Sequence, residues 1–169
     1  SFREVGAELG LSRPTFSMGS NYGDLDNDGW LDFYLATGDP QFESLIPNRM
    51  YRNDGGRHFQ EVTASGGFGH LQKGHGVAFG DIDGDGDQDV LANQGGAYAG
   101  DGYYKALFLN PGHGNHWVTL LLEGSKANRA AIGARLTLLL TTPEGPRTLY
   151  ATVSSGSSFG GNSLRQEIG

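Results

Sequence analysis

Two short stretches of the sequence carry aspartates at every second position. They read GDLDNDGWLD, residues 23–32, and GDIDGDGDQD, residues 80–89, and each contains the pattern D-x-D-x-D-G-x-x-D. Carboxylates packed so closely repel one another unless a positive charge lies between them. The glycine of the pattern permits a sharp bend, so that alternate side chains can converge on one centre. The pattern therefore predicts two cation sites.

The ligand chemistry of these stretches favours calcium. Calcium takes six to eight oxygen ligands at about 2.3–2.6 Å, which carboxylates, a backbone carbonyl and water can supply, whereas magnesium tolerates a crowded protein cage poorly. We expect two calcium ions. In each loop four aspartates would act through their carboxylates, and one further residue, Trp30 or Asp87, through its backbone carbonyl. The predicted ligands are Asp24, Asp26, Asp28, Trp30 and Asp32 in the first loop and Asp81, Asp83, Asp85, Asp87 and Asp89 in the second.

Two other interpretations of the acidic stretches compete with this one. An EF-hand requires a glutamate at position 12 and flanking helices, but position 12 is Leu35 in one copy and Ala92 in the other, and both flanks have the composition of strands. A pair of ordinary solvated turns is the second alternative, because Asp, Asn and Gly favour turns. Two copies in register, with every ligand position filled, favour calcium.

The acidic stretches belong to a longer internal repeat. Residues separated by 57 positions match without a gap across the whole unit, and FREV aligns with FQEV. A fixed period of this length is typical of repeat architectures. The matched pairs include Phe2 with Phe59, Glu4 with Glu61, Gly19 with Gly76, Tyr51 with Phe108, and Asn53 with Asn110. We therefore expect residues 1–115 to form two tandem units, 2–58 and 59–115.

The repeat unit predicts the fold class. Each unit has short β-type segments separated by turns, and four short strands per unit of this length are typical of propeller blades. After His116 the segments NHWVTLLLEG, AIGARLTLLLTT and RTLYATVSSG predict three strands of a C-terminal antiparallel β module over residues 116–169, with HWVTLL grafted onto the edge of the second blade. The prediction is an all-β protein: two β-propeller-type blades followed by this module.

The motifs resemble a known family. GDLDNDGWLDFYLATG and GVAFGDIDGDGDQDVLANQG resemble the FG-GAP or VCBS-type repeats of integrin-like β-propellers and secreted bacterial proteins, and NHWVTLLLEGSKANRAAIGARLTLLL is similar to the ASPIC/UnbV module of the cartilage acidic protein family and its bacterial relatives. The resemblance implies a secreted, extracellular and non-enzymatic protein stabilised by calcium, with the acidic positions as ligands. It supplies no activity, because a fold does not fix a function.

Composition limits the classes of partner. The formal net charge of −7 makes nucleic acid and anionic membranes poor partners. The chain has no cysteine, so thiol catalysis and thiolate metal sites are excluded. No apolar run is long enough for a membrane span, and no leader is recognised at the start of the sequence.

Other residues invite functional interpretations that the sequence supports less well. His70 with His75 and His113 with His116 could bind a transition metal, but both pairs lie in Gly-rich loops without a carboxylate pattern. SSGSSFGG lacks the nucleophile elbow, so we expect no enzyme. Asn128, Arg129 and Arg135 fit either a structural network or a ligand site. The tyrosines that could line a glycan-binding surface, or pack between blades, are Tyr98, Tyr103 and Tyr104.

The function predicted from the sequence is a calcium-dependent extracellular structural or interaction module. Two blades do not close a propeller, which takes about four to eight, so exposed strand edges need a cover. FREV resembles the closing strand of an absent blade, which indicates either a piece of a longer chain or a subunit that self-associates or binds another protein through its blade edges. A carbohydrate-binding module of a larger secreted protein is the alternative. A hydrolase with a metal-bound water is a weaker one.

Overall fold

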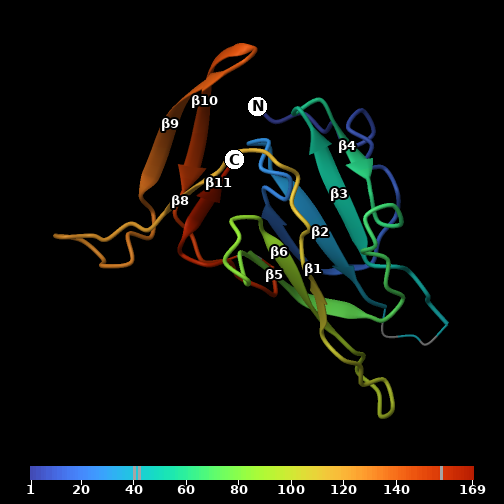
Figure 1. The fold of residues 1–169 in the computed structure, drawn as a ribbon. Coiled ribbons are helices and arrows are strands. Elements are labelled where there is room, and N and C mark those ends of the chain that lie inside the picture. Colours follow the sequence, from blue (N-terminus) through green and yellow to red (C-terminus); the bar gives the residue numbers. More distant parts are fainter. Residues whose placement is uncertain (40, 42, 157) are drawn as a thin grey trace.

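The computed structural model describes residues 1–39, 41, 43–156 and 158–169, and every regular element in them is a β-strand. The strands pair antiparallel in separate sheets, which confirms the predicted all-β fold class and is compatible with a β-propeller-like fold (Figure 1). In these residues no helix has the length and apolar character needed to cross a membrane.

The first blade is a four-stranded antiparallel meander. Its strands are β1 (Ser17–Gly23), β2 (Asp32–Thr37), β3 (Arg49–Asp54) and β4 (His58–Glu61), and they lie in this order in the sheet. The aspartates of residues 24–31 occupy the connection between β1 and β2, which we call the first acidic loop. Strand pairing therefore brings both ends of this loop together.

The second blade repeats the first at the predicted offset. Its strands are β5 (Gly74–Gly80), β6 (Asp89–Gln94) and β7 (Ala106–Phe108). Strands β5 and β6 begin and end at the positions that the repeat assigns to the counterparts of β1 and β2. The pairing also repeats, because the strand ends that flank the acidic loop are opposite each other in both blades. The second acidic loop, residues 81–88, therefore occupies the same place in its blade as the first.

The second blade differs from the prediction at its outer edge. By the repeat, residues 115–118 would form its fourth strand, but in the described part of the chain β8 (Val118–Leu120) pairs with β11 (Gln166–Ile168) and β7 pairs with β6 alone. The predicted grafting of HWVTLL onto this edge is thus wrong. A side chain at Gly86 would overlap the Trp117 ring, so the segment leading into β8 crosses the second acidic loop instead of following β7.

The C-terminal region, residues 116–169, contains the three predicted strands and one that was missed. Strands β9 (Arg135–Thr142) and β10 (Gly145–Thr152) form a hairpin, whereas β8 pairs with the unexpected β11 in a second sheet. The three predicted strands therefore do not share one sheet. The hairpin, orange in Figure 1, is separate from the sheets of the blades, and its residues alternate between half-buried and exposed.

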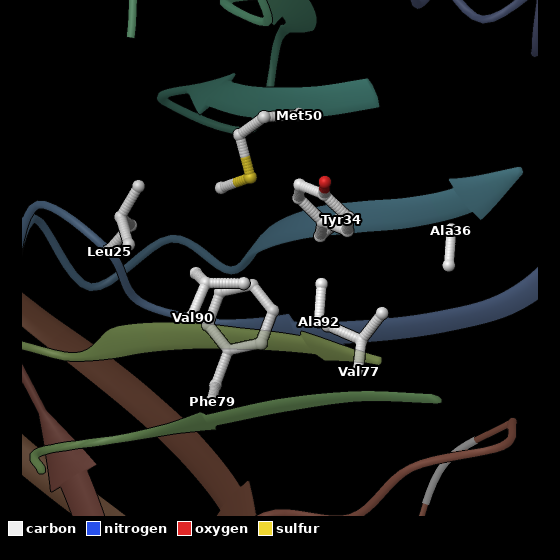
Figure 2. Close-up of a cluster of buried hydrophobic side chains, with 8 residues drawn as sticks. All are labelled: Leu25, Tyr34, Ala36, Met50, Val77, Phe79, Val90 and Ala92. Atoms are coloured by element: carbon white, nitrogen blue, oxygen red, sulfur yellow. The ribbon is translucent and has the colours of Figure 1, made fainter. Parts of the chain in front are cut away.

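The hydrophobic core lies between the two blades. Strands of both blades contribute side chains that point toward one another (Figure 2), and Tyr34, Met50 and Val90 are fully buried among them. The ring of Phe108 packs against that of Phe68, with centroids 5.2 Å apart, at the border of this cluster. The core residues are Leu25, Tyr34, Ala36, Met50, Val77, Phe79, Val90 and Ala92. Because neither blade buries this face alone, the core fixes the two acidic loops relative to each other.

Glycine permits a close backbone approach at equivalent places in both blades. A Cβ at Gly19 of β1 would overlap the carbonyl oxygen of His75 on β5. A Cβ at Gly76, the counterpart of Gly19 in the repeat, would overlap the carbonyl oxygen of Phe159 in the C-terminal region. The sheet of each blade thus packs backbone to backbone against the segment that follows it.

Candidate metal centres

The first acidic loop gathers three of its predicted ligands. One carboxylate oxygen from each of Asp24, Asp26 and Asp28 lies within 4.8 Å of the others. Asp24 Oδ1 accepts a hydrogen bond from the N–H of Asp28 (3.0 Å), and its Oδ2 accepts one from Gly29 (2.8 Å). Asn27 and Gly29 have positive φ angles of 53° and 77°, which curl the loop around the carboxylate of Asp24. The loop thus has the convergent shape that the sequence predicted.

The second acidic loop gathers a slightly different set. One carboxylate oxygen from each of Asp81, Asp83 and Asp89 lies within 4.8 Å of the others. Asp81 Oδ1 accepts from the N–H of Gly84 (2.7 Å) and its Oδ2 from Gly86 (3.1 Å). Asp83 is exposed, whereas its counterpart in the first loop is buried. The second centre is therefore the more open of the two.

The aspartate that closes each loop pins it to the neighbouring strand. Asp32 Oδ2 accepts from the N–H of Leu25 (2.9 Å), and its Oδ1 accepts from Asn53 (2.7 Å). Asp89 Oδ2 makes the same contact with Ile82 (2.8 Å). Both aspartates are buried, and only Asp89 falls within the group of converging carboxylates, so the structure does not bring Asp32 into the first group.

The remaining predicted ligands lie beside the centres. Asp28 Oδ1 accepts from the N–H of Trp30 (2.8 Å), and Asp85 Oδ1 accepts from that of Asp87 (3.0 Å), so the two loops turn in the same way after position 5. The side chain of Asp87 faces the other loop, where its Oδ1 accepts from Asn27 Nδ2 (2.6 Å). The carbonyls of Trp30 and Asp87 stay predicted ligands.

Two arginines that sequence reasoning missed contact the first loop. Arg52 Nε lies 2.5 Å from Asp26 Oδ2. Arg147, on β10, donates to the backbone carbonyls of Asp28 (2.5 Å) and Gly29 (2.8 Å), and its guanidinium lies 4.6 Å from the centre of the Trp30 ring. No local motif could have revealed these contacts, because Arg52 and Arg147 lie on strands far along the chain.

Burial raises the pKa of two carboxylates of the first loop, Asp24 and Asp32. Burial raises the pKa of Asp24 to about 6, against the opposing effect of hydrogen bonds from the backbone of Gly169 and Gly29. Burial also raises the pKa of Asp32 to about 7, and the carboxylates of Asp26 and Asp24 add to the increase. A pKa raised by burial and by like charges is the electrostatic condition that a bound cation relieves.

The donor set fits calcium. All converging atoms are carboxylate oxygens, the hard ligands that calcium prefers. Asp26 is only 4% exposed, and its Oδ1 is buried without a hydrogen-bond partner within the described residues. A buried polar atom without a partner is costly, and a cation beside it would satisfy it.

The two loops contact each other directly. Asn27 Nδ2 donates to the Gly86 carbonyl (3.3 Å), and Asn110 Nδ2 donates to the Leu25 carbonyl (2.6 Å). Asn115 Nδ2 donates to the Asp26 carbonyl (2.9 Å). These side chains cross between the blades at the level of the acidic residues, so the shape of each loop depends on the other.

The other residues singled out in the sequence take mostly structural places. His75 lies on β5, not in a loop as expected, and its Nε2 is 2.6 Å from the Gly95 carbonyl. Asn128 makes two hydrogen bonds with the backbone of Ile132 (3.0 and 2.8 Å), and Arg129 forms an exposed ion pair with Glu123. These contacts favour the structural network over a ligand site.

The tyrosines considered for glycan binding are exposed. Tyr104 is 86% exposed, and the ring of Tyr103 contacts those of Tyr104 and His70, with centroids 6.1 and 5.0 Å away.

Of the serines in SSGSSFGG, Ser157 lies outside the described residues, and Ser158 forms a β-bridge with Ser20.

Comparison with known proteins supports the FG-GAP part of the resemblance. A search of curated proteins gives no match. Residues 24–92, which run from the first aspartate of the first acidic loop to the middle of β6, match the family model described as an FG-GAP-like repeat.

Proposed function

We propose that this chain is a calcium-stabilised extracellular interaction module. The FG-GAP-like match favours an extracellular interaction module in general. The observation that best supports calcium binding is that the centre occurs twice. In both blades, at equivalent places, one oxygen from each of three carboxylates lies within 4.8 Å of the others. One such cluster could be a solvated turn, but two in the same register, one of them buried, favour a ligand.

The protein's own residues prepare each centre. Asp24 and Asp81 order the loop by accepting backbone N–H groups. Asp32 ties the first loop to β3 through Asn53, and Asp89 ties the second to the segment just after β7 through Asn110. Calcium would supply the positive charge that lets the convergent carboxylates stay ionised together. With the loops formed, β1 and β5 are held at the spacing that the core between the blades requires.

Calorimetry tests the proposal. The chain, freed of metal with a chelator and dialysed, is titrated with calcium chloride and, separately, with magnesium chloride. We expect two calcium ions per chain, weaker magnesium binding, and a melting temperature that rises with calcium. Sites of this kind in extracellular modules bind at about 10⁻⁴–10⁻³ M. Absence of both calcium binding and a melting shift would refute the proposal.

Charge-matched variants give the control. Asp26→Asn and Asp83→Asn should each remove one equivalent of bound calcium. Glu144→Gln removes one negative charge from an exposed position in the turn between β9 and β10 and should leave both sites intact. If Glu144→Gln lowered calcium binding as much as the loop variants, the ion would be responding to net charge and not to the loops.

Self-association through a blade edge is a second candidate, favoured by the open edge of β7. Within the described residues β7 pairs with β6 alone, and Leu107 on this strand is 48% exposed. The occupant we propose is the segment Phe2–Val5 of a second copy. Its counterpart by the repeat, Phe59–Val62, lies mostly in β4, the strand that fills this edge in the first blade. Residues 2–5 form no strand here, and Phe2 is fully exposed.

Sedimentation velocity tests this candidate. In millimolar calcium we expect the mean mass to rise with protein concentration. Glu4→Pro, which removes a backbone N–H from the segment, should abolish the rise, and Glu4→Ala should preserve it. A chain that stays monomeric at all concentrations contradicts self-association and leaves calcium binding untouched.

A further inference from the structure

The two blades differ in charge at one position beside the acidic loop, which lies in β3 of the first blade and just after β7 of the second. Arg52 directly precedes Asn53, whose N–H binds the closing aspartate of the first loop. Leu109, the counterpart of Arg52 in the repeat, directly precedes Asn110, whose N–H binds the closing aspartate of the second loop. The two positions are therefore equivalent in the repeat, and the residue after each makes the same backbone contact, but only one of the two carries a charge.

Arg52 places its charge inside the first loop. Its Nε lies 2.5 Å from Asp26 Oδ2, and the side chain of Asp26 is only 5% exposed. A charge-assisted hydrogen bond to a buried carboxylate is a strong one. Part of the negative charge of the first loop is therefore balanced by the protein itself.

The second loop has no such partner. Within the described part of the chain, no lysine, arginine or histidine forms an ion pair with any of the five aspartates of residues 81–89. Asp83, the counterpart of Asp26, is exposed, and so is Leu109. Within the described residues, backbone N–H groups bind the carboxylates of this loop, but no cationic side chain balances their charge.

We infer that Arg52 is an internal counter-ion of the first loop, which keeps that loop formed without metal and competes there with calcium, so that the second loop is the calcium-responsive one. This inference rests on the proposed calcium binding and adds a difference between the two sites. It makes Arg52 a residue that sets the affinity of the first site.

Elementary electrostatics gives the direction and the scale. A unit positive charge beside a ligand repels an incoming divalent cation, and at a few ångströms near a protein surface the repulsion corresponds to roughly tenfold or more in the dissociation constant. Removing Arg52 should therefore strengthen calcium binding in the first loop while weakening that loop when metal is absent. Adding an arginine at position 109 should do the reverse in the second loop.

Single-site calorimetry isolates each effect. Calcium is titrated into the full chain in two backgrounds. The first carries Asp83→Asn, so that only the first site remains intact, and the second carries Asp28→Asn, so that only the second site remains intact. In the first background we expect Arg52→Leu to lower the dissociation constant about tenfold or more. In the second background we expect Leu109→Arg to raise it by a similar factor.

Amide exchange in chelator supplies an independent readout. The N–H groups of Gly29 and Gly86 make equivalent hydrogen bonds to the first aspartate of their loops (2.8 and 3.1 Å), so they report whether each loop stays formed. We expect Gly86 to exchange faster than Gly29 in the unaltered chain. In the double variant with Arg52→Leu and Leu109→Arg, we expect Gly29 to exchange faster than Gly86.

The outcomes separate this inference from the proposed function. Absence of calcium binding in the unaltered chain refutes calcium binding altogether and the inference with it. Calcium binding that is unchanged by either substitution, together with equal exchange at the two glycines, overturns the role of Arg52 and leaves the proposed function standing. If Arg52→Leu fails to fold, Leu109→Arg still tests the inference, because position 109 is exposed. An unchanged dissociation constant of the second site in that variant would then overturn the role of Arg52.

Discussion

Oδ1 of Asn162 lies 2.5 Å from Nδ2 of Asn21, a residue 141 positions earlier in the chain. The same Oδ1 accepts from the N–H of Phe79 on β5 (3.0 Å), and Asn162 Nδ2 donates to the Tyr22 carbonyl on β1 (2.9 Å). One amide side chain of the C-terminal region therefore joins a strand of the first blade to a strand of the second. The C-terminal region is thus a structural clamp on the pair of blades that carry the acidic loops.

Asn162→Ala should destabilise the whole chain. The substitution leaves the buried amide of Asn21 and the N–H of Phe79 without this acceptor, and each lost partner of this kind costs about 1–3 kcal/mol. We expect the free energy of unfolding, measured by urea denaturation followed by circular dichroism, to fall by about 2–3 kcal/mol. Lys126→Ala, in an exposed loop, should change it by less than about 0.5 kcal/mol. An unaltered midpoint for Asn162→Ala would show that the clamp is dispensable.

Alanine substitutions should separate packing glycines from permissive ones. A Cβ at Gly19 would overlap a backbone carbonyl, and so would one at Gly76, whereas a Cβ at Gly80 meets nothing within 4 Å. We expect Gly19→Ala and Gly76→Ala to lower the unfolding free energy by at least about 2 kcal/mol, because backbone must move. Gly80→Ala, on the same strand as Gly76, should be neutral or slightly stabilising. Thermal denaturation of the three variants compares them, and equal melting temperatures would contradict close packing of the blades.

The repeat explains why most strands could be predicted. Strands β5 and β6 follow from β1 and β2 because the constant spacing of the repeat carries the turn glycines and the alternation of side chains together. The short β11 was missed because its segment, Gln166–Ile168, carries too little alternation to be recognised. The diversion of β8 from the edge of β7 could not be predicted either, since it depends on Trp117 packing against Gly86.

The candidate site was predictable in its carboxylates but not in its surroundings. The spacing of the aspartates indicated their convergence because a loop closed by paired strands leaves little freedom. Arg52 and Asn162 reach the loops or the blades through tertiary packing, and neither belongs to a motif. Asn27 did carry a signal, because it stands where the second loop has Gly84, and its positive φ of 53° explains why this position takes Asn or Gly.

Asp89→Asn should destabilise the chain even with calcium present. Both carboxylate oxygens of Asp89 accept backbone N–H groups, from Ile82 (2.8 Å) and Asn110 (2.9 Å), and the residue is 1% exposed. An amide supplies only one acceptor and turns a donor toward the other N–H, so we expect a loss of about 2–3 kcal/mol in chelator. The loss should be larger in calcium, because Asp89 is also one of the converging carboxylates. The exposed Asp85, substituted Asp85→Asn, is the control and should lower stability only in calcium. Urea denaturation under both conditions distinguishes the two, and a loss for Asp89→Asn that vanishes in chelator would contradict the structural role.

Arg147→Lys should loosen the contact between the β9–β10 hairpin and the first acidic loop. Arg147 holds two backbone carbonyls at once and lies over the ring of Trp30, which a lysine cannot reproduce because its ammonium is a point charge without a planar fork. Hydrogen bonds from a charged donor are worth about 1.5–3 kcal/mol each, so we expect faster amide exchange at Gly29 and a loss of about 1–3 kcal/mol in unfolding free energy. The control is Arg135→Lys, which makes the same chemical change at an exposed position of β9. It should leave both the amide exchange at Gly29 and the unfolding free energy unchanged. If exchange at Gly29 stays at the rate of the unaltered chain, the hairpin does not support the loop, and the order of the first centre depends on Arg52 and the aspartates alone.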